Sequence, residues 1–204
     1  MAQQFIVIEG LDGSGKSTAS KLLTERFLSH NLPCFHTCEP TNSPIGTLIR
    51  SILTGKEKPV SNETMALLFA ADRTQHLTDE ILPLLTHSNV ICDRYYYSNM
   101  AYQGSDEESL ERVVQYNQTA IAYGKPDITF FINVTPEECM RRVEKRGESI
   151  SIYETLPKLK LQHERFMAAF ERMKKTDNMI IVGSDTMSPN EIVDEMWSYL
   201  TPTT

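Results

Sequence analysis

The sequence lacks an excess of positive charge and lacks any long hydrophobic segment. Its 204 residues include 20 lysines and arginines against 27 acidic residues, which gives a formal net charge of -7. A chain of this charge has no broad basic surface for a nucleic-acid polymer, so we expect no partner of that kind. The mean hydropathy is -0.33 and no apolar run is long enough to cross a membrane. Small molecules in water are the expected substrates.

We expect neither a targeting segment nor a cysteine-rich metal motif. The first apolar run, Phe5–Ile8, is short and has no basic region before it, which is unlike a signal peptide. The four cysteines include no C-x-x-C pair. His36 between Cys34 and Cys38 allows a metal site as one interpretation, but strand alternation places His36 on the opposite face from the two cysteines. We therefore favour reduced thiols in a cytoplasmic protein.

Short β-branched runs alternate with longer segments of helical period. Strands are predicted at residues 5–9, 34–38, 89–93, 128–134 and 179–182. Helices are predicted at residues 16–30, 61–86, 107–123, 136–146, 155–176 and 189–200, two of them with a hydroxyl cap followed by proline, at Thr135-Pro136 and Ser188-Pro189. This alternation predicts a parallel sheet covered by helices on both faces. No repeat or linker divides the chain, so a single domain over residues 1–204 is expected.

The first predicted strand and helix are joined by a glycine-rich segment. Gly10-Leu11-Asp12-Gly13-Ser14-Gly15-Lys16-Ser17 matches G-x-x-x-x-G-K-[ST] in the context that this motif requires. Its glycines let backbone N–H groups face phosphate oxygens, and the helix N-terminus adds positive potential. In this pattern Lys16 reaches the β- and γ-phosphates and Ser17 ligates magnesium. The motif predicts a site for Mg²⁺ and a nucleoside triphosphate whose phosphates contact Gly10, Asp12, Gly13, Ser14, Gly15, Lys16, Ser17 and Thr18.

The phosphate loop does not identify the group that receives the phosphate. After Ser17 the chain has neither D-x-x-G nor N-K-x-D, which a GTPase needs, and it has no L-S-G-G-Q, so a small kinase or an ATPase remains. The third predicted strand ends in Asp93-Arg94, and the carboxyl ends of parallel strands line the ligand crevice. Asp93 is a candidate for the magnesium shell and Arg94 for an acceptor phosphate. A helix-capping aspartate followed by a surface arginine is the alternative.

Several further segments stand in the order and spacing of one enzyme family. They are Glu39-Pro40 leading to Gly46 and Arg50, Phe69-x-x-x-Arg73, Asp93-Arg94-Tyr95-x-x-Ser98-x-x-Ala101-Tyr102-Gln103-Gly104, Pro126-Asp127 and Arg146-Gly147. With the phosphate loop, they resemble the thymidylate kinase family, whose members pass the γ-phosphate of ATP to dTMP, and the resemblance covers nearly the whole chain. It implies a P-loop kinase fold, a three-layer α/β sandwich with about five parallel strands and a short lid near residues 142–154, and it implies a homodimer. A kinase for another nucleoside monophosphate and a non-catalytic nucleotide-binding regulator are the alternatives.

The resemblance also implies roles for individual residues in binding dTMP. The implied set is Asp12, Glu39, Arg50, Phe69, Arg73, Arg94, Ser98, Asn99 and Tyr102. Phe69 and Arg73 share a helix face, so that the ring stacks on thymine while the guanidinium donates to a ring carbonyl. Asn99 offers a donor and an acceptor to the base edge. Tyr102 lies against the sugar where a 2′-hydroxyl would otherwise fit, and Asp12 accepts from the 3′-hydroxyl.

Phosphoryl transfer needs cations around the moving group. Arg50 and Arg94 hold the monophosphate in the implied site, where the catalytic set is Asp12, Lys16, Arg94 and Arg146 and the Mg²⁺ ligands are Ser17 and Asp93. Gly13 stands where some members have a basic residue, so a lid cation must supply that charge, with Arg142, Lys145 and Arg146 as the candidates. The chain departs from the family at Ser151-Ile152, where Asp-Arg is common, and at Cys38, where an arginine usually precedes Glu-Pro.

Overall fold

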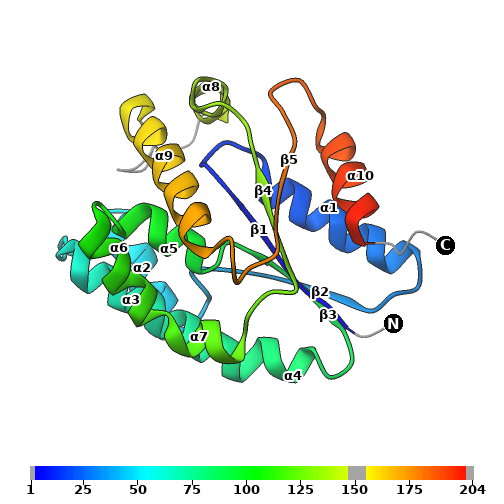
Figure 1. Cartoon of the computed structure of the whole chain (residues 1–204), viewed down its shortest axis with the longest axis horizontal. Coiled ribbons are helices and arrows are strands. Elements are labelled where there is room, and N and C mark those ends of the chain that lie inside the picture. Colours follow the sequence, from blue (N-terminus) through cyan, green and yellow to red (C-terminus); the bar gives the residue numbers. More distant parts are fainter. Residues whose placement is uncertain (1–2, 147–154, 201–204) are drawn as a thin grey trace.

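One parallel sheet lies at the centre of the molecule (Figure 1), in a computed structural model that describes residues 3–146 and 155–200. The strands of the described chain are β1 (Phe5–Gly10), β2 (Cys34–Cys38), β3 (Asn89–Asp93), β4 (Ile128–Ile132) and β5 (Met179–Val182). Their order across the sheet is β2-β3-β1-β4-β5, and every neighbouring pair is parallel. The predicted parallel sheet is confirmed.

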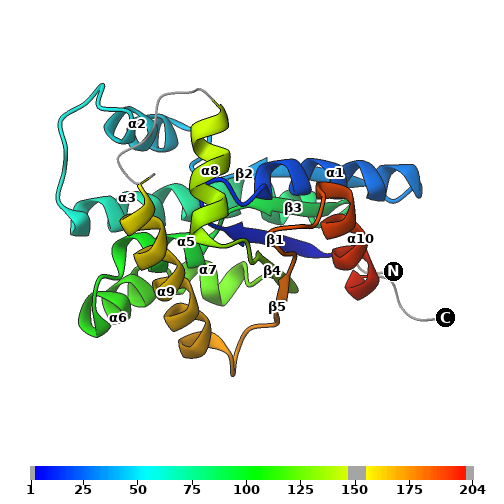
Figure 2. The same cartoon turned by 90° about the horizontal axis from the view of Figure 1, so that it is seen from above.

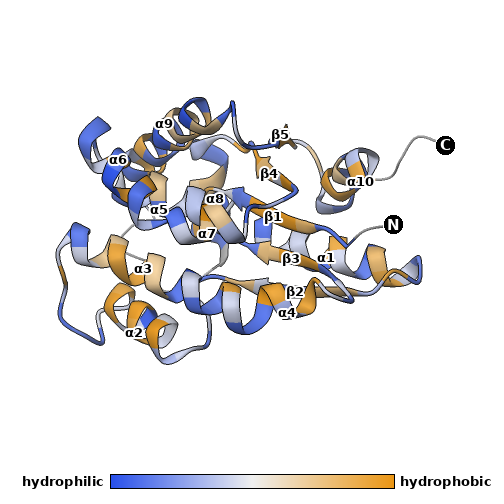
Figure 3. Ribbon diagram, turned by 60° about the horizontal axis from the view of Figure 1, so that its bottom comes forward, coloured by the Kyte–Doolittle hydropathy of each residue, from blue (hydrophilic) through white to orange (hydrophobic). Residues whose placement is uncertain are grey.

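The burial of each strand follows from its place in the sheet. Every residue of β1, β3 and β4 is buried, whereas the edge strands β2 and β5 are mostly half-buried or exposed. Parallel strands covered on both faces are continuous apolar runs, and hydrophobic colour is concentrated on the central strands in Figure 3. Ile8 pairs with both Asp93 and Phe130, so β1, β3 and β4 end at the same edge of the sheet.

Helices form a layer on each face of the sheet. They are α1 (Lys16–Ser29), α2 (Pro44–Leu53), α3 (Asn62–His76), the π-helical turn η1 (Leu77–Ile81), α4 (Leu82–Leu84), α5 (Tyr96–Gln103), α6 (Glu107–Tyr116), α7 (Gln118–Tyr123), α8 (Pro136–Arg146), α9 (Leu156–Met173) and α10 (Pro189–Leu200). Helices α1 and α10 pack together on one face, and α5 packs between α3 and α9 on the other (Figures 1 and 2). This is the expected three-layer α/β architecture of a P-loop kinase.

Two helices, α2 and α5, lie outside the predicted ranges. Helix α2 is short and begins at Pro44, where the Oγ of Ser43 accepts from the backbone N–H of Gly46 at 3.0 Å. That cap is a local signal that the sequence carries. Helix α5 is buried along its length except at Tyr102, so it has no polar face and no amphipathic period from which a helix could be predicted.

Three predicted elements have different limits. The range 107–123 is interrupted at Asn117, whose Nδ2 donates to the Val113 carbonyl at 2.7 Å, and forms α6 and α7. The range 61–86 is divided into α3, η1 and α4. The predicted strand 128–134 ends at Ile132, because the N–H of Val134 donates to the Ile132 carbonyl at 3.2 Å and turns the chain out of the sheet.

Both predicted helix caps are present. The Oγ1 of Thr135 accepts from the N–H of Glu138 at 3.3 Å, and the Oγ of Ser188 accepts from the N–H of Glu191 at 3.3 Å. Glu191 completes a capping box by accepting from the N–H of Ser188 at 2.7 Å. None of the described helices is long and apolar enough to span a bilayer.

The four cysteines are free thiols. His36 lies 2.9 Å from the Oγ of Ser20 on α1, which gives the ring a partner in the helix layer. The metal-site interpretation of the segment Cys34–Cys38 gains no support from these contacts.

Aromatic side chains fill the space between β4 and α9. Phe131 is fully buried, with its ring centroid 5.1 Å from that of Phe166 and 4.9 Å from that of Phe170. These contacts fix α9 against the sheet.

We predict that Phe131→Ala lowers the free energy of unfolding by about 3–5 kcal/mol, because it removes buried apolar area and leaves a cavity. Urea denaturation measures the change. Tyr123→Ala is the control, since Tyr123 is 73% exposed and its loss should cost no more than about 0.5 kcal/mol. Equal unfolding midpoints for the two variants would contradict the assignment of Phe131 to the core.

Candidate active site

The phosphate loop lies between β1 and α1, as predicted. Gly13 and Gly15 have φ values of 86° and 93°, a region that favours glycine. Lys16 is 5% exposed, its Nζ donates to the Leu11 carbonyl at 3.0 Å, and it lies 3.6 Å from an Asp12 oxygen. Burial lowers the pKa of Lys16. The loop thus holds a buried amine beside the N-terminus of α1, which is a suitable site for phosphate.

Two oxygen side chains meet next to Lys16. The hydroxyl of Ser17 donates to Oδ2 of Asp93, while Oδ1 of Asp93 is buried and has no hydrogen-bond partner among the described residues. A hydroxyl and a carboxylate with an unused buried oxygen are hard donors of the kind that Mg²⁺ prefers. The two predicted metal ligands are therefore brought together, and their chemistry fits magnesium.

The ends of β1 and β3 are joined by an ion pair between Asp12 and Arg94. Asp12 also accepts a hydrogen bond from the Tyr102 hydroxyl at 2.9 Å, and the guanidinium of Arg94 lies 5.5 Å from the centroid of the Tyr102 ring. Burial raises the pKa of Asp12, but the charges of Arg94 and Lys16 bring it well below its ordinary value. Asp12 is thus held as an anion. Three predicted residues from two separate segments, the phosphate loop and the segment that begins at Asp93, form one cluster here.

A residue absent from the predicted set, Glu9, positions this cluster. It is fully buried at the end of β1, and it accepts from the N–H groups of Tyr95 and Ser98 at 2.8 and 3.0 Å and from the Ser98 hydroxyl at 2.6 Å. Arg94 in turn donates to the Ser98 oxygen at 3.1 Å. Burial raises the pKa of Glu9, although these hydrogen bonds and Arg94 oppose the shift. Glu9 therefore caps α5 and fixes the residue that supports Arg94.

Arg94 itself has an unusual backbone conformation. Its φ is 70°, a value that is costly for a residue with a side chain and that occurs preferentially at functional sites. Its N–H donates to the Ile8 carbonyl at 3.0 Å, and Ile8 is next to Glu9. The conformation directs the guanidinium back across the carboxyl edge of the sheet toward Asp12.

A cleft of about 670 Å³ opens along this edge. Its lining includes six of the eight residues predicted to contact the ATP phosphates, namely Asp12, Gly13, Gly15, Lys16, Ser17 and Thr18. It also includes Asp93 and Arg94, and Cys38 and Glu39 from the end of β2. Helix α2 contributes Arg50, whose guanidinium donates to the Thr41 carbonyl at 2.7 Å. Asp72 fixes that segment by accepting from the Thr41 N–H at 2.7 Å. Positive side chains from three elements therefore face one hollow.

Of the three lid candidates, Arg142 lies in the cleft wall. Its guanidinium donates to the Glu138 carboxylate at 2.7 Å, to the Ser14 carbonyl at 3.5 Å and to the Asp185 carbonyl at 3.2 Å. Lys145 is exposed on α8. The side chain of Arg146 and residues 147–154 of the expected lid lie outside the described part of the chain.

The predicted base-reading residues lie behind the cleft rather than in its wall. Arg73 is 1% exposed, its guanidinium forms an ion pair of 2.5 Å with Glu39, and it donates to the side-chain oxygens of Asn117 at 2.6 Å and Asn99 at 3.3 Å. The Nδ2 of Asn99 donates to Gln103 at 3.0 Å. Arg73 and Asn99 are thus neighbours, as expected, and are fixed by buried partners.

Phe69 occupies a different environment from Arg73. It is half-buried and packs against a small apolar cluster between α2 and α3 that contains Ile49, Ile52 and Met65. Phe69 on α3 therefore packs against α2, the helix that carries Arg50.

A second hollow, of about 300 Å³, lies on the outer side of the phosphate loop. It is lined by Ser14, Gly15, Arg142, Met187, Pro189 and Ile192. The last three belong to the segment after β5, which carried no predicted function. An apolar wall beside an arginine and the phosphate loop suits a flat aromatic ring.

Comparison with known proteins agrees with the family resemblance that the sequence motifs indicate. A family profile described as thymidylate kinase matches residues 8–196. The chain is 39% identical to the probable thymidylate kinase of Methanocaldococcus jannaschii over 96% of this chain and 95% of that protein. It is 40% identical to the probable thymidylate kinase of Thermococcus kodakarensis, with 83% and 87% covered, and 36% identical to the thymidylate kinase of Leptospira interrogans, with 94% and 90% covered.

The fit of α8 against the phosphate loop depends on Gly13. A Cβ at this position would lie 2.4 Å from the Cys139 carbonyl oxygen and 3.1 Å from a methyl of Val143. We predict that Gly13→Ala lowers the free energy of unfolding by about 2–4 kcal/mol, the sum of a strained φ and an overpacked contact. Urea denaturation measures the loss.

Gly55→Ala is the matched control. Gly55 has a similar φ of 73°, but a Cβ there would meet nothing within 4 Å, so its substitution isolates backbone strain. Gly55→Ala should lower the free energy of unfolding by about 1 kcal/mol. Equal losses of unfolding free energy in the two variants would show that the close fit between Gly13 and α8 does not contribute to stability.

Proposed function

The chain belongs to the thymidylate kinase family, and from that membership we propose that it transfers the γ-phosphate of ATP to dTMP, giving dTDP and ADP. The observation that carries this proposal is the cluster of Asp12, Arg94 and Tyr102 beside the phosphate loop. Because Asp12 and Arg94 also line the cleft beside Lys16, the cluster supports an acceptor site next to the donor phosphates.

The donor half of the reaction uses the phosphate loop and α1. Lys16 holds the β- and γ-phosphates, and the backbone N–H groups of the loop bind their oxygens. Ser17 and Asp93 would hold Mg²⁺ through a hydroxyl and a carboxylate oxygen. The ion supplies positive charge to the phosphates. The hollow of Met187, Pro189 and Ile192 takes the adenine ring, with Arg142 at its edge.

The acceptor half uses side chains from three segments. Arg50 and Arg94 bind the monophosphate of dTMP and turn it toward Lys16. Asp12 accepts a hydrogen bond from the 3′-hydroxyl of the sugar, and its low pKa keeps the carboxylate ionised at neutral pH. Tyr102 is held against Asp12 and closes the space that a 2′-hydroxyl would occupy. The site therefore binds a deoxyribonucleotide.

Base recognition is assigned to Phe69, Arg73, Ser98 and Asn99. Phe69 provides a flat apolar surface at the edge of the α2–α3 cluster. The Nε of Arg73 is buried and has no hydrogen-bond partner among the described residues, so the guanidinium keeps a donor for a ring carbonyl. Asn99 on α5 accepts from the Arg73 guanidinium at 3.3 Å, and Ser98 precedes it on the same helix.

The moving phosphoryl group needs positive charge on several sides. Lys16 and Arg94 lie in the cleft, and Arg142 reaches the Ser14 carbonyl of the loop. Because Gly13 leaves no room for a side chain beneath α8, a further cation must come from the lid candidates Arg142, Lys145 and Arg146. Such cations stabilise charge that develops during transfer without forming covalent bonds to it.

The protein is further proposed to form a homodimer in the cytoplasm. Leu48 on α2 and Leu67 on α3 are 42% and 47% exposed, which supplies apolar surface for a second copy. The exposed free thiol of Cys38 is compatible with a reducing compartment.

An acceptor panel tests the proposed reaction. We predict that, with Mg²⁺ and ATP, dTMP is phosphorylated with the highest kcat/KM among dTMP, dUMP, UMP, CMP and GMP, as followed by ADP release. Packing around the 5-methyl group contributes about 1 kcal/mol to binding, so the kcat/KM for dUMP should be only about 5–10-fold lower than that for dTMP. Efficient use of UMP, CMP or GMP with poor use of dTMP would overturn the assignment.

A second prediction concerns the donor side. Lys16→Ala should lower kcat by at least about 100-fold, because uncompensated charge on the β- and γ-phosphates raises the barrier. Steady-state kinetics with dTMP measure the effect. Lys21→Ala on α1 is the control and should leave kcat unchanged, since Lys21 is exposed and is not among the residues lining the cleft. Near-normal turnover in Lys16→Ala would remove this lysine from the mechanism.

A further inference from the structure

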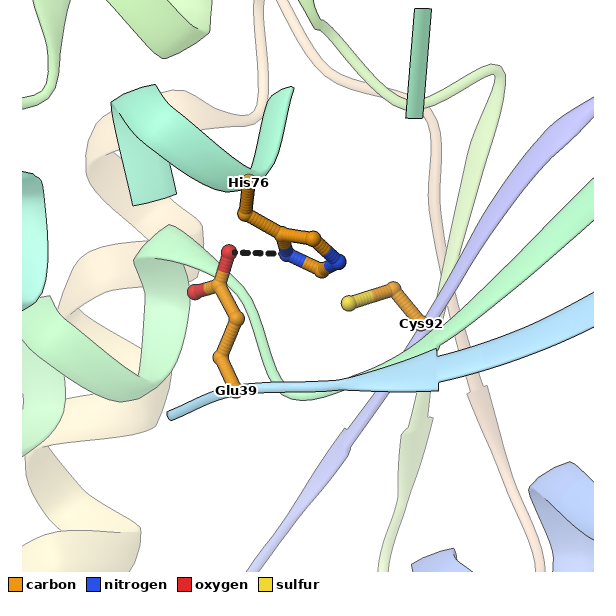
Figure 4. A group of neighbouring side chains, drawn as sticks. All are labelled: Glu39, His76 and Cys92. Carbon is orange, nitrogen blue, oxygen red and sulfur yellow. Dashed lines mark hydrogen bonds and ion pairs between the residues drawn. The ribbon is translucent and has the colours of Figure 1, made fainter. Parts of the chain in front are cut away.

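A group of three buried polar side chains adjoins the cleft, which one of them, Glu39, also lines, and the other two have no role in the proposed reaction. Glu39 follows β2, His76 ends α3 and Cys92 belongs to β3, and one potential ligand atom from each lies within 4.8 Å of the others. In Figure 4 the ring of His76 lies between the Glu39 carboxylate and the Cys92 sulfur. All three residues are at most 5% exposed. Polar groups at this depth need partners, so their arrangement requires an explanation.

The contacts of this group are those of a hydrogen-bond network rather than a metal site. Glu39 is paired with the Arg73 guanidinium at 2.5 Å. Both ring nitrogens of His76 are engaged, and the Cys92 thiol donates to the Arg94 carbonyl at 3.0 Å. Burial raises the pKa of Cys92 well above its ordinary value, which keeps the thiol protonated. A dication here would have to displace a guanidinium and several hydrogen bonds.

Hydrogen-bond directions identify the charge on His76. Nδ1 faces an oxygen of Glu39 at 3.1 Å. Nε2 lies 2.8 Å from the Thr37 oxygen and 3.2 Å from Glu80, and the Thr37 hydroxyl already donates its hydrogen to Glu80 at 2.6 Å. With the Thr37 hydroxyl donating to Glu80, both ring nitrogens face acceptors among the described residues, an arrangement that suits an imidazolium donating from both nitrogens.

Four alternating charges therefore run from the surface to Arg73. Glu80 is 41% exposed, His76 and Glu39 are buried, and Arg73 is 1% exposed. The other titratable group facing His76 is the neutral thiol of Cys92. Each buried charge has an opposite charge next to it, which offsets its desolvation.

We propose that His76 is a positioning residue for base recognition, which fixes Arg73 by holding the Glu39 carboxylate between the imidazolium and the guanidinium. The inference rests on the proposed function of Arg73 as a thymine reader. One Glu39 oxygen contacts His76 and the other contacts Arg73, so a change at one oxygen reorients the other. Asn117 and Asn99 hold only one of the two terminal nitrogens of Arg73, and Glu39 fixes the other. His76 would touch no substrate.

The first test separates binding of dTMP from the rest of the reaction. His76→Gln keeps a hydrogen-bond donor but removes the charge, and we expect it to raise the KM for dTMP by about 10-fold, the size of one hydrogen bond to a charged partner. The KM for ATP and kcat should change by less than about 2-fold. A general structural defect would alter all three. Equal changes in the two KM values would overturn the proposal.

Two further variants place the effect on Arg73 and provide a control. In an Arg73→Ala background, His76→Gln should raise the KM for dTMP no further, whereas multiplicative effects would contradict a pathway through Arg73. His30→Gln is the same substitution at the far end of α1, beside Trp197, and should change none of the constants. If the wild-type chain did not phosphorylate dTMP at all, the proposed function would fail first.

The pH profile supplies a readout that a purely structural role would not change. Burial lowers the pKa of His76, but the hydrogen bond and charge of Glu39, together with Glu80, raise it above its ordinary value. In the folded protein the imidazolium is therefore present at pH values below this raised pKa, and its contribution to dTMP binding is lost as the pH rises through it. The ratio of KM for dTMP in His76→Gln to that in wild type should therefore fall with rising pH, and titration of dTMP itself cancels in this ratio.

Glu80→Gln keeps this test valid even if His76→Gln is unstable. Glu80 is partly exposed, and its substitution removes one charge that favours the imidazolium. The pH at which the KM for dTMP rises should then move downward relative to wild type, with the KM for ATP unchanged. An unshifted profile in Glu80→Gln, or a flat ratio for His76→Gln, would overturn the role of His76.

Discussion

The site depends on one buried carboxylate. Glu9 ends the central strand immediately before the phosphate loop, and it accepts the first N–H groups of α5 and the Ser98 hydroxyl. It therefore fixes the start of α5, and with it Arg94, relative to the loop that holds Lys16. Donor and acceptor phosphates must approach in line within a few tenths of an ångström for efficient transfer, so this connection between two strands is a requirement of the proposed chemistry.

The charge balance is reversed locally at this edge of the sheet. The chain carries a net charge of -7, yet Lys16, Arg50, Arg94 and Arg142 line one cleft. Each of these cations has an oxygen partner from the protein, as in the Asp12–Arg94 pair or the contact of Arg142 with Glu138. Such partners hold the cations in place at a tolerable desolvation cost, and they leave enough positive potential for two polyanionic substrates.

The sequence predicted the parts of the site that are local in the chain. The phosphate loop, the strand that ends at Asp93 and the spacing of Phe69 and Arg73 all follow from neighbouring residues. Glu9 and His76 were not predicted, because their partners are 86 and 37 positions away and nothing beside them in the sequence marks a buried polar residue. Helix α5 was missed for a related reason: a helix buried on all sides has no polar period.

If Arg73 reads the base as proposed, its depth has a consequence for specificity. Its guanidinium is fixed by Glu39, Asn117 and the Tyr95 ring, whose centroid lies 5.1 Å away, so its position is set by folding. A donor fixed in this way loses little freedom when it binds a ring carbonyl, and it cannot swing to water when the carbonyl is absent. Ligands without that acceptor then leave a buried donor unpaired, which costs more than a missing methyl group. Discrimination by hydrogen bonding should accordingly be stronger at Arg73 than discrimination by shape around the 5-methyl group.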